Sequence, residues 1–470
     1  PISNPEKRIP NQAKTNFPGI GPNESKADYA SRMQKIYPGL NVGETIFDYH
    51  RRIRFLQRQS QKLGMEIPKF DLGLTDVSEI SAPSSDIDLI NIKNLTPPVK
   101  VWNGYVPPVS IQMQKAMRGV GTSLPKSMQS RCDPKQRIAK LRSFGGFAEG
   151  EEAVIKGLNW LQTMQDEDGS WGIKDRDSKN EPLLVDSHYK NAMTGMALLC
   201  YLGRCELQDS PDYGPTVQKA IKFITSTTPE PKIDQRGSYS HPIRTYALCE
   251  AYTMTKIKRL EEFAKRATIH IIKGQNENGG WAYSYGKGPA AHTDLSVTGW
   301  NIQALKAAAY TGIEISGLDE AMDKAIEYVK KCQDSKGAFG YKMGSNGKSS
   351  LTGTGILSLQ IWKNAKSEEA KKGLEWIIQN EAVKEDWSAI NVYGWYYHAQ
   401  ACFQATGVSG GSKFWKAWNK NFQKTVCSNQ AEDGHWKHGA HFHGDTEIYR
   451  TTMAILMLEV YYRYMPTTKV

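Results

Sequence analysis

The chain has 470 residues, of which 39% are hydrophobic and 23% charged, with a mean hydropathy of -0.55 and a formal net charge of +11. This length allows one large domain or two to three ordinary ones, and it can bury a substantial core. No run approaches the 18 apolar residues of a transmembrane helix, which excludes a membrane-spanning chain.

Residues 1–145 differ from the rest of the chain in charge. They contain 22 Lys and Arg against 12 Asp and Glu, a net charge of +10, together with 14 of the 22 prolines. Apart from one amphipathic helix expected over residues 44–63, they read as an irregular arm. A basic, Pro-rich arm is typical of a segment that contacts a protein partner or an acidic surface, and we favour these over nucleic acid. A solvated linker is the alternative.

The cysteines give little evidence of a compartment. There are seven, none in a CxxC pair, and three of them (Cys200, Cys249 and Cys402) lie in apolar helical patterns. An odd count without local pairing argues against a disulfide scaffold. We expect a soluble protein; periplasmic and peripheral locations remain open, as does a signal or anchor beyond these residues.

From about residue 148 a unit of roughly fifty residues recurs six times. Each unit has a charged amphipathic helix, a turn with Gly and an aromatic residue, and a second helix with almost no charge. The aromatic residues of the turns are spaced by 68, 42, 58, 48 and 49 residues. The turns are Gln165–Trp171, Gln235–Tyr239, Gln275–Trp281, Gln333–Phe339, Glu385–Trp387 and Gln430–Trp436.

The two helices of a unit differ in their expected surroundings. Residues 318–334 alternate charged and apolar side chains, as a helix with one solvent-facing side does, whereas residues 351–363 carry no charge before Lys363. Six outer helices that shield six inner ones predict an all-α fold, an (α/α)6 toroid over residues 146–470. An open solenoid is the competing architecture.

The turn sequences resemble a known family. The segment from Lys156 to Trp171, KGLNWLQTMQDEDGSW, is similar to the full QW repeat of triterpene cyclases, and the turns ending at Trp281, Phe339 and Trp436 match its second half. The resemblance covers residues 148–465 and implies the superfamily of squalene–hopene cyclases, class II terpene cyclases and protein prenyltransferase β-subunits. Residues 445–465 also resemble bacterial squalene-cyclase-like proteins of undefined activity.

The repeat itself predicts stability and not chemistry. Its Gln can bond the free backbone groups at a helix end, its Gly permits a positive φ, and its aromatic side chain fills the gap between outer helices. Fold does not imply function.

The beginnings of the inner helices should meet at one mouth of the ring, where a site is the default expectation. Asp186, Asp294 and Asp445 are the candidate catalytic acids there, with N-caps as the alternative reading, which suits Asp294 and Asp445. The other side chains expected to bind a ligand at the mouth are His188, His241, Arg244, His292, Tyr393 and Arg450.

The motifs that carry the superfamily's chemistry are missing. Class II cyclases protonate an alkene with an Asp of a DxDD motif, and this sequence contains no such motif. The most similar segment is Asp175-Arg-Asp177, which we expect on a solvent-exposed loop. The Asp-x-Cys that helps to hold zinc in prenyltransferases is also absent. No cofactor is required, but His438, His441 and His443 could converge with Asp445 on zinc. A His-rich surface loop is the alternative.

Three functions follow. The first, which we favour, is a toroid that binds or assembles with a partner through its mouth and its basic arm. The second is an enzyme acting on an isoprenoid or another apolar substrate, with a terpene-cyclase-like ring. The third is a metal-dependent or glycan-active enzyme at the mouth, for which paired carboxylates such as Asp186 and Asp294 would be needed.

Overall fold

The structure, a computed structural model, describes residues 124–125, 128–176, 181–183, 185–226, 237–288, 291–381, 386–439 and 445–463. All of them belong to one compact unit, Trp102–Val470. The helix predicted over residues 44–63 and most of the basic arm lie outside the described residues. None of the described helices is long and apolar enough to cross a membrane.

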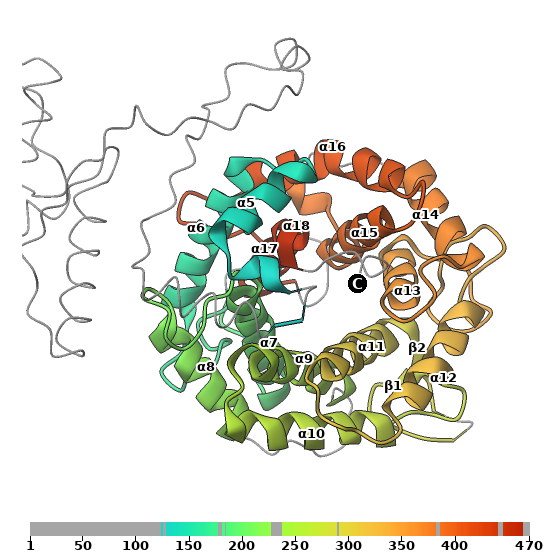
Figure 1. Cartoon of the computed structure of the whole chain (residues 1–470), viewed down its shortest axis with the longest axis horizontal. Helices are drawn as coiled ribbons and strands as arrows, with labels where there is room; N and C mark the ends of the chain where they lie inside the picture. Colours follow the sequence, from blue (N-terminus) through green and yellow to red (C-terminus); the bar gives the residue numbers. More distant parts are fainter. Residues whose placement is uncertain are drawn as a thin grey trace, which may run out of the picture. The chain divides into compact units, whose positions relative to one another are not determined.

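Six helices form an inner ring (Figure 1). Each packs against the next, and the last, α17, packs against the first, α7, so that the ring is closed. These helices are buried nearly all round, as the uncharged stretch Leu351–Gln360 of α13 illustrates. The inner helices are α7 (Ser187–Gly203), α9 (Gly237–Thr255), α11 (Leu295–Tyr310), α13 (Ser349–Ile361), α15 (Val392–Gln404) and α17 (Glu447–Leu458).

Six amphipathic helices surround this ring (Figure 1). In α12, for example, Ala325, Ile326 and Val329 are buried while the charged side chains between them are exposed. Together the two rings confirm the predicted all-α toroid. The outer helices are α6 (Ala148–Met164), α8 (Gly214–Ser226), α10 (Lys258–Lys273), α12 (Leu318–Lys331), α14 (Glu368–Asn380) and α16 (Ser412–Ser428).

The turn after an outer helix is built by its Gln, Gly and aromatic residue. After α10, Gln275 Nε2 donates to the carbonyl oxygens of Gly279 (2.9 Å) and of Ala321 in α12 (2.7 Å). Trp281 lies buried and its Nε1 donates to Ile271 O at 2.8 Å. The turn therefore ties one outer helix to the next while its aromatic ring fills the space between them.

The same arrangement recurs at three other turns, where Gln165, Gln333 and Gln430 each bond their own turn and the next outer helix. At Gln430 the next helix is α6, the first of the ring, because its Nε2 donates to Ala153 O at 2.8 Å. The last turn thus clasps the first helix and closes the outer ring.

A few short elements complete the described chain. The antiparallel pair β1 (Trp281–Ala282) and β2 (Thr293–Asp294) places Trp281 opposite Asp294 at the start of α11. The short helices η5 (Trp387–Ala389) and η6 (Ala405–Gly407) flank α15.

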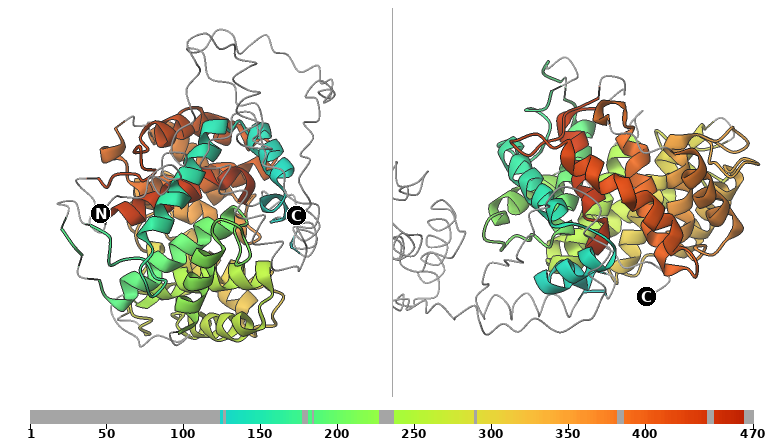
Figure 2. Two further views of the ribbon diagram at one scale, coloured as in Figure 1. Left: turned by 90° about the vertical axis from the view of Figure 1, so that its left-hand side faces the viewer. Right: turned by 90° about the horizontal axis from the view of Figure 1, so that it is seen from above.

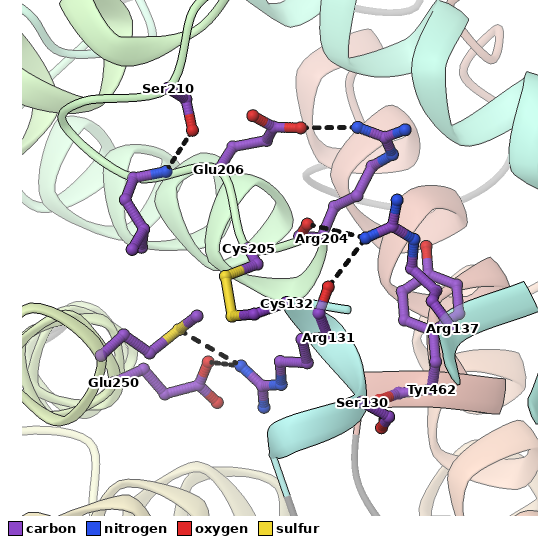
Figure 3. The surroundings of a disulfide bond; sticks show 12 residues. Ser130, Arg131, Cys132, Arg137, Arg204, Cys205, Glu206, Ser210, Glu250 and Tyr462 are labelled. Carbon is purple, nitrogen blue, oxygen red and sulfur yellow. Dashed lines mark hydrogen bonds and ion pairs between the residues drawn. A yellow bond between two sulfur atoms is a disulfide. The ribbon is translucent and has the colours of Figure 1, made fainter. Parts of the chain in front are cut away.

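One end of the ring is covered by short helices from both ends of the described chain. The helices η4 (Gln129–Arg131) and α5 (Pro134–Ser143) pack on α18 (Val460–Arg463), and in the side view the blue-green N-terminal helices lie at one edge of the ring (Figure 2). A disulfide joins Cys132 to Cys205 at the end of α7 (Figure 3). The sequence argued against a disulfide scaffold but did not predict this single bond, whose partners lie 73 residues apart in sequence; the other five cysteines are free.

Candidate functional site

The inner helices begin at the end of the ring opposite the disulfide, and we call this end the mouth. One partly exposed tyrosine comes from the start of each inner helix or from the turn before it. Six helix or turn positions thus supply the same amphipathic side chain, with an apolar ring face and a polar hydroxyl. We call these residues the mouth tyrosines: Tyr189, Tyr239, Tyr283, Tyr341, Tyr393 and Tyr449.

Several mouth tyrosines contact one another directly. The ring centroids of Tyr239 and Tyr283 lie 5.4 Å apart, and Tyr341 OH donates to Tyr283 OH at 3.0 Å. Lys348 Nζ lies 5.5 Å from the centre of the Tyr341 ring, and exposed His292 packs at 5.6 Å from the same ring. The mouth therefore combines aromatic faces, hydroxyl groups and a few ionisable side chains at its edge.

Asp294 is a buried acid beneath these tyrosines. Its Oδ1 caps α11 by accepting from Val297 N (3.0 Å) and also accepts from Ser296 Oγ (2.5 Å), so the predicted N-cap is confirmed. Its Oδ2 is buried, and the carboxyl group lies close enough to Tyr341 to raise the pKa of that phenol, although burial is the larger cause. Burial raises the pKa of Asp294, and burial is also the largest cause of the raised pKa of Tyr239 and of Tyr393. Burial therefore favours the neutral form of this carboxyl group more than water does.

Asp175 is a second buried acid at the mouth. The expectation that it lies on a solvent-exposed loop is wrong, because the side chain is 0% exposed. Its Oδ2 accepts from Tyr189 OH (2.5 Å), and its Oδ1 accepts from the backbone of α17 at Ile448 N (3.3 Å). Burial raises the pKa of Asp175. The residue joins α7 to α17, where the inner ring closes; Asp177 lies outside the described residues.

Asp445 and Arg450 form a buried ion pair in place of the expected N-cap. Arg450 Nε donates to both carboxylate oxygens of Asp445, at 2.9 and 2.8 Å, and the cap of α17 is Thr446 instead. The Nη1 and Nη2 donors of Arg450 reach Trp387 O (2.6 Å) and Ile390 O (2.8 Å). The pair therefore ties α17 to the segment before α15, which gives both residues a structural role.

The other predicted mouth residues are divided between the mouth and the space between the rings. Asp186 is an exposed cap of α7, and the Nδ1 of partly exposed His188 lies 3.1 Å from Ser240 Oγ. His241 instead points between the rings, with its Nδ1 2.8 Å from Tyr285 OH, and Arg244 donates to Ile224 O at the end of α8. The structure does not bring His241 and Arg244 to the mouth.

The proposed zinc ligands are described in part. His438 Nδ1 lies 3.8 Å from Glu447 Oε1, while His441 and His443 lie outside the described residues. Within the described ranges, no group of three or more His, Cys, Asp or Glu side chains is arranged to hold a metal. The zinc site stays a prediction.

Below the mouth, side chains of α11 and α15 pack against one another inside the ring. Tyr396 and Tyr397 of α15 meet Trp300 and Gln303 of α11 across the inside of the ring, and all four are at most 5% exposed. Gln303 Nε2 donates to Tyr397 OH (2.8 Å) and Tyr396 OH donates to Gln303 Oε1 (3.2 Å). These residues form a floor under the mouth.

A small internal space lies nearer the disulfide end. It has a volume of ≈ 10 Å³, about enough for one water molecule, and is lined by Gln400, Gln404, Leu456, Val460 and Arg463.

Sequence reasoning missed the mouth tyrosines as a set and the burial of Asp175. The tyrosines stand at different distances from the repeated turns, so no spacing marks them. Asp175 lies in a charged segment, and its burial follows from the contact between α7 and α17, which a linear pattern does not contain.

Comparison with known proteins agrees with this architecture. A squalene–hopene cyclase of Bradyrhizobium diazoefficiens is 24% identical over 212 residues, which are 42% of this chain and 31% of the cyclase, so the match spans about a third of that relative. An inactive variant of an α-1,6-mannanase of Salegentibacter sp. HEL1_6, in complex with α-1,6-mannotetrose, superposes with a TM-score of 0.51 at 12% identity, covering 67% of this chain and 99% of the other.

An unsaturated glucuronyl hydrolase specific for heparin gives a TM-score of 0.51 at 14% identity, covering 68% of this chain and 98% of that one. At such identities the two structures share the fold with this chain and nothing more is implied. The model of the prenyltransferase alpha-alpha toroid domain matches residues 151–386, half of the sequence. The chain therefore belongs to the prenyltransferase alpha-alpha toroid domain family.

Proposed function

We propose that this protein is a binding protein of the toroid family, which holds a ligand against the mouth tyrosines. The observation that carries the proposal is the contrast between the two levels of the ring. Six tyrosines are partly exposed at the mouth, while the side chains directly below them are almost completely buried. Partly exposed aromatic side chains that keep a polar hydroxyl are the type that binding surfaces use.

The packing of α11 and α15 side chains below the mouth counts against the cyclase alternative. Folding a long isoprenoid chain around a developing carbocation requires an apolar cavity that shields the substrate from water. Trp300, Tyr396 and Tyr397 occupy the inside of the ring with mutual contacts instead. The missing DxDD motif agrees with this reading.

The basic arm would then act as the second contact of the protein. Its net charge of +10 suits an acidic surface or an acidic protein partner, because electrostatic attraction speeds encounter and orients the chain. In this proposal the ring supplies ligand recognition and residues 1–145 supply attachment.

The test is titration calorimetry of the full chain with three probes: squalene, geranylgeranyl diphosphate and α-1,6-mannotriose. We expect at least one probe to bind without being converted to a product. The double variant Tyr239→Ala/Tyr393→Ala should weaken the affinity for that probe by about tenfold or more, which corresponds to about 1.4 kcal/mol of binding free energy. Tyr310→Ala is the matched control, since Tyr310 is also partly exposed but ends α11 at the far side of the ring. Conversion of a probe to a cyclic product, or equal affinity in all variants, would contradict the proposal.

Asp294 supports a second candidate, an enzyme that uses a general acid at the mouth. Its burial and its raised pKa are features that a general acid needs. The variant Asp294→Asn separates the two functions, because Asn is an equally good N-cap but cannot transfer the proton. Turnover of any of the three probes that Asp294→Asn abolishes would favour the enzyme.

A further inference from the structure

The end of the ring opposite the mouth is closed by an arginine that does not belong to the repeats. Arg131 is the last residue of η4, and its side chain is 0% exposed. It enters the ring between α9 and α18 (Figure 3). A fully buried arginine side chain requires partners for its charge and its donors.

The partners of Arg131 form a fitted seat for a guanidinium group. Its Nε donates to Arg463 O at 2.6 Å, and its Nη1 donates to Glu250 Oε2 at 2.8 Å and approaches Met254 Sδ at 3.8 Å. Glu250 is 1% exposed and also pairs through Oε1 with Arg463 Nη2 at 3.3 Å. The carbonyl oxygen and the carboxylate oxygen lie where two N–H donors of one planar guanidinium group can reach both of them. An ammonium group does not offer this arrangement of donors.

The acceptors of this seat come from the ring itself. Glu250 is part of α9 and Arg463 ends α18, whereas Arg131 arrives from the segment before α6. Its neighbours hold that segment down: Ser130 Oγ donates to Tyr462 O at 2.9 Å, and Cys132 is bonded to Cys205. The ring thus supplies the hydrogen-bond acceptors, and the N-terminal segment supplies the guanidinium group that binds to them.

A further acid lies close to the seat. Glu459 is 0% exposed, and neither carboxyl oxygen has a hydrogen-bond partner among the described residues. It fits against Gly203, where any side chain would collide, since a Cβ would lie 2.0 Å from Glu459 Oε2. Burial raises the pKa of Glu459, whereas Glu250 is the carboxylate that forms the ion pair with Arg131 at 2.8 Å.

We infer that the end of the ring opposite the mouth is a guanidinium-binding site, and that the chain fills it with its own Arg131. The ligand class is the arginine side chain, read by one carboxylate and one backbone carbonyl. Because the disulfide joins the next residue to α7, Arg131 is delivered to the site at a high effective concentration. The site is separate from the mouth and does not depend on the function proposed for it.

The experiment is chemical rescue of Arg131→Gly in the full chain. Thermal unfolding is followed by near-ultraviolet circular dichroism while guanidinium chloride is added at low, non-denaturing concentrations, against sodium chloride and methylammonium chloride at equal ionic strength. We expect guanidinium to raise the melting temperature of Arg131→Gly along a saturating curve, while the two other salts do not. If Arg131→Gly is unfolded in sodium chloride, the same titration is read as recovery of the folded signal.

Two controls identify the site. Arg142→Gly removes an exposed arginine of α5 and should gain nothing from guanidinium. Arg131→Gly combined with Glu250→Gln should lose the rescue, because the charged acceptor is gone. An equal response of Arg131→Gly to guanidinium and to sodium chloride, or rescue that survives Glu250→Gln, would overturn the inference.

Discussion

The clasp that closes the outer ring offers a sharp test of the fold, through Gly434. This residue has φ +106, a conformation that side-chain-bearing residues rarely adopt. A Cβ placed there would lie 2.3 Å from Lys156 O in α6, a backbone atom that cannot move without its helix. The substitution Gly434→Ala therefore strains the turn and pushes it away from α6.

The cost can be worked out from these contacts. Backbone strain at such a φ contributes about 1–3 kcal/mol. Separation from α6 also weakens the bond of Gln430 Nε2 to Ala153 O, which is 2.8 Å long, at about 1 kcal/mol. The total loss of unfolding free energy is therefore about 2–4 kcal/mol.

Gly312 provides the matched control, because it has φ +76 with nothing within 4 Å of the position that a Cβ would occupy. Gly312→Ala should cost about 1–2 kcal/mol, from strain alone. Urea unfolding of the two variants measures the difference. Equal losses would refute the reasoning that the last turn clasps the first helix.

Three further predictions concern other parts of the ring. Replacing Cys132 and Cys205 by Ser should cost about 4 kcal/mol in urea unfolding, because the disulfide closes a loop of 73 residues, and wild type with reductant should match the variant. Glu459→Gln should reduce the dependence of the unfolding free energy on pH. Because the pKa of Glu459 is raised in the folded state, the native protein keeps a proton that the unfolded chain releases near pH 4.5, so the stability of the wild type falls as pH rises above that value. If the difference in unfolding free energy between variant and wild type is constant from pH 5 to pH 8, the prediction is wrong. Trp281→Phe should lower the unfolding free energy by about 1 kcal/mol in thermal unfolding, because it removes the hydrogen bond to Ile271 O. Phe339 fills the same place in another turn, and Phe339→Leu should lower the unfolding free energy by more than Trp281→Phe does.

The ring could be predicted from sequence because its determinants are local and repeated. Uncharged and amphipathic helices alternate, and five of the six turns carry a Gln, a Gly and an aromatic residue, so most units contain the information for their contact with the next. The N-cap role of Asp294 was predictable for the same reason, since a cap depends on the few residues that follow it.

The site was less predictable because its residues are joined by contacts distant in sequence. His241 and Arg244 were expected at the mouth from their position near a helix start, but which side of that helix they occupy depends on Tyr285 and Ile224. Asp175 is buried by α17, more than 270 residues later in the chain. The seat of Arg131 likewise depends on Glu250 and Arg463, which no local pattern connects to it.

Central to the proposed function is a ring that binds at its mouth, above the packed side chains of α11 and α15. Diffraction from a crystal of the full chain under xenon pressure tests this directly, because xenon enters dry apolar cavities. We predict no xenon among Trp300, Gln303, Tyr396 and Tyr397, whose side chains are at most 5% exposed. Xenon bound between these residues would reveal a hydrophobic chamber, contradict the packed floor and restore the cyclase alternative.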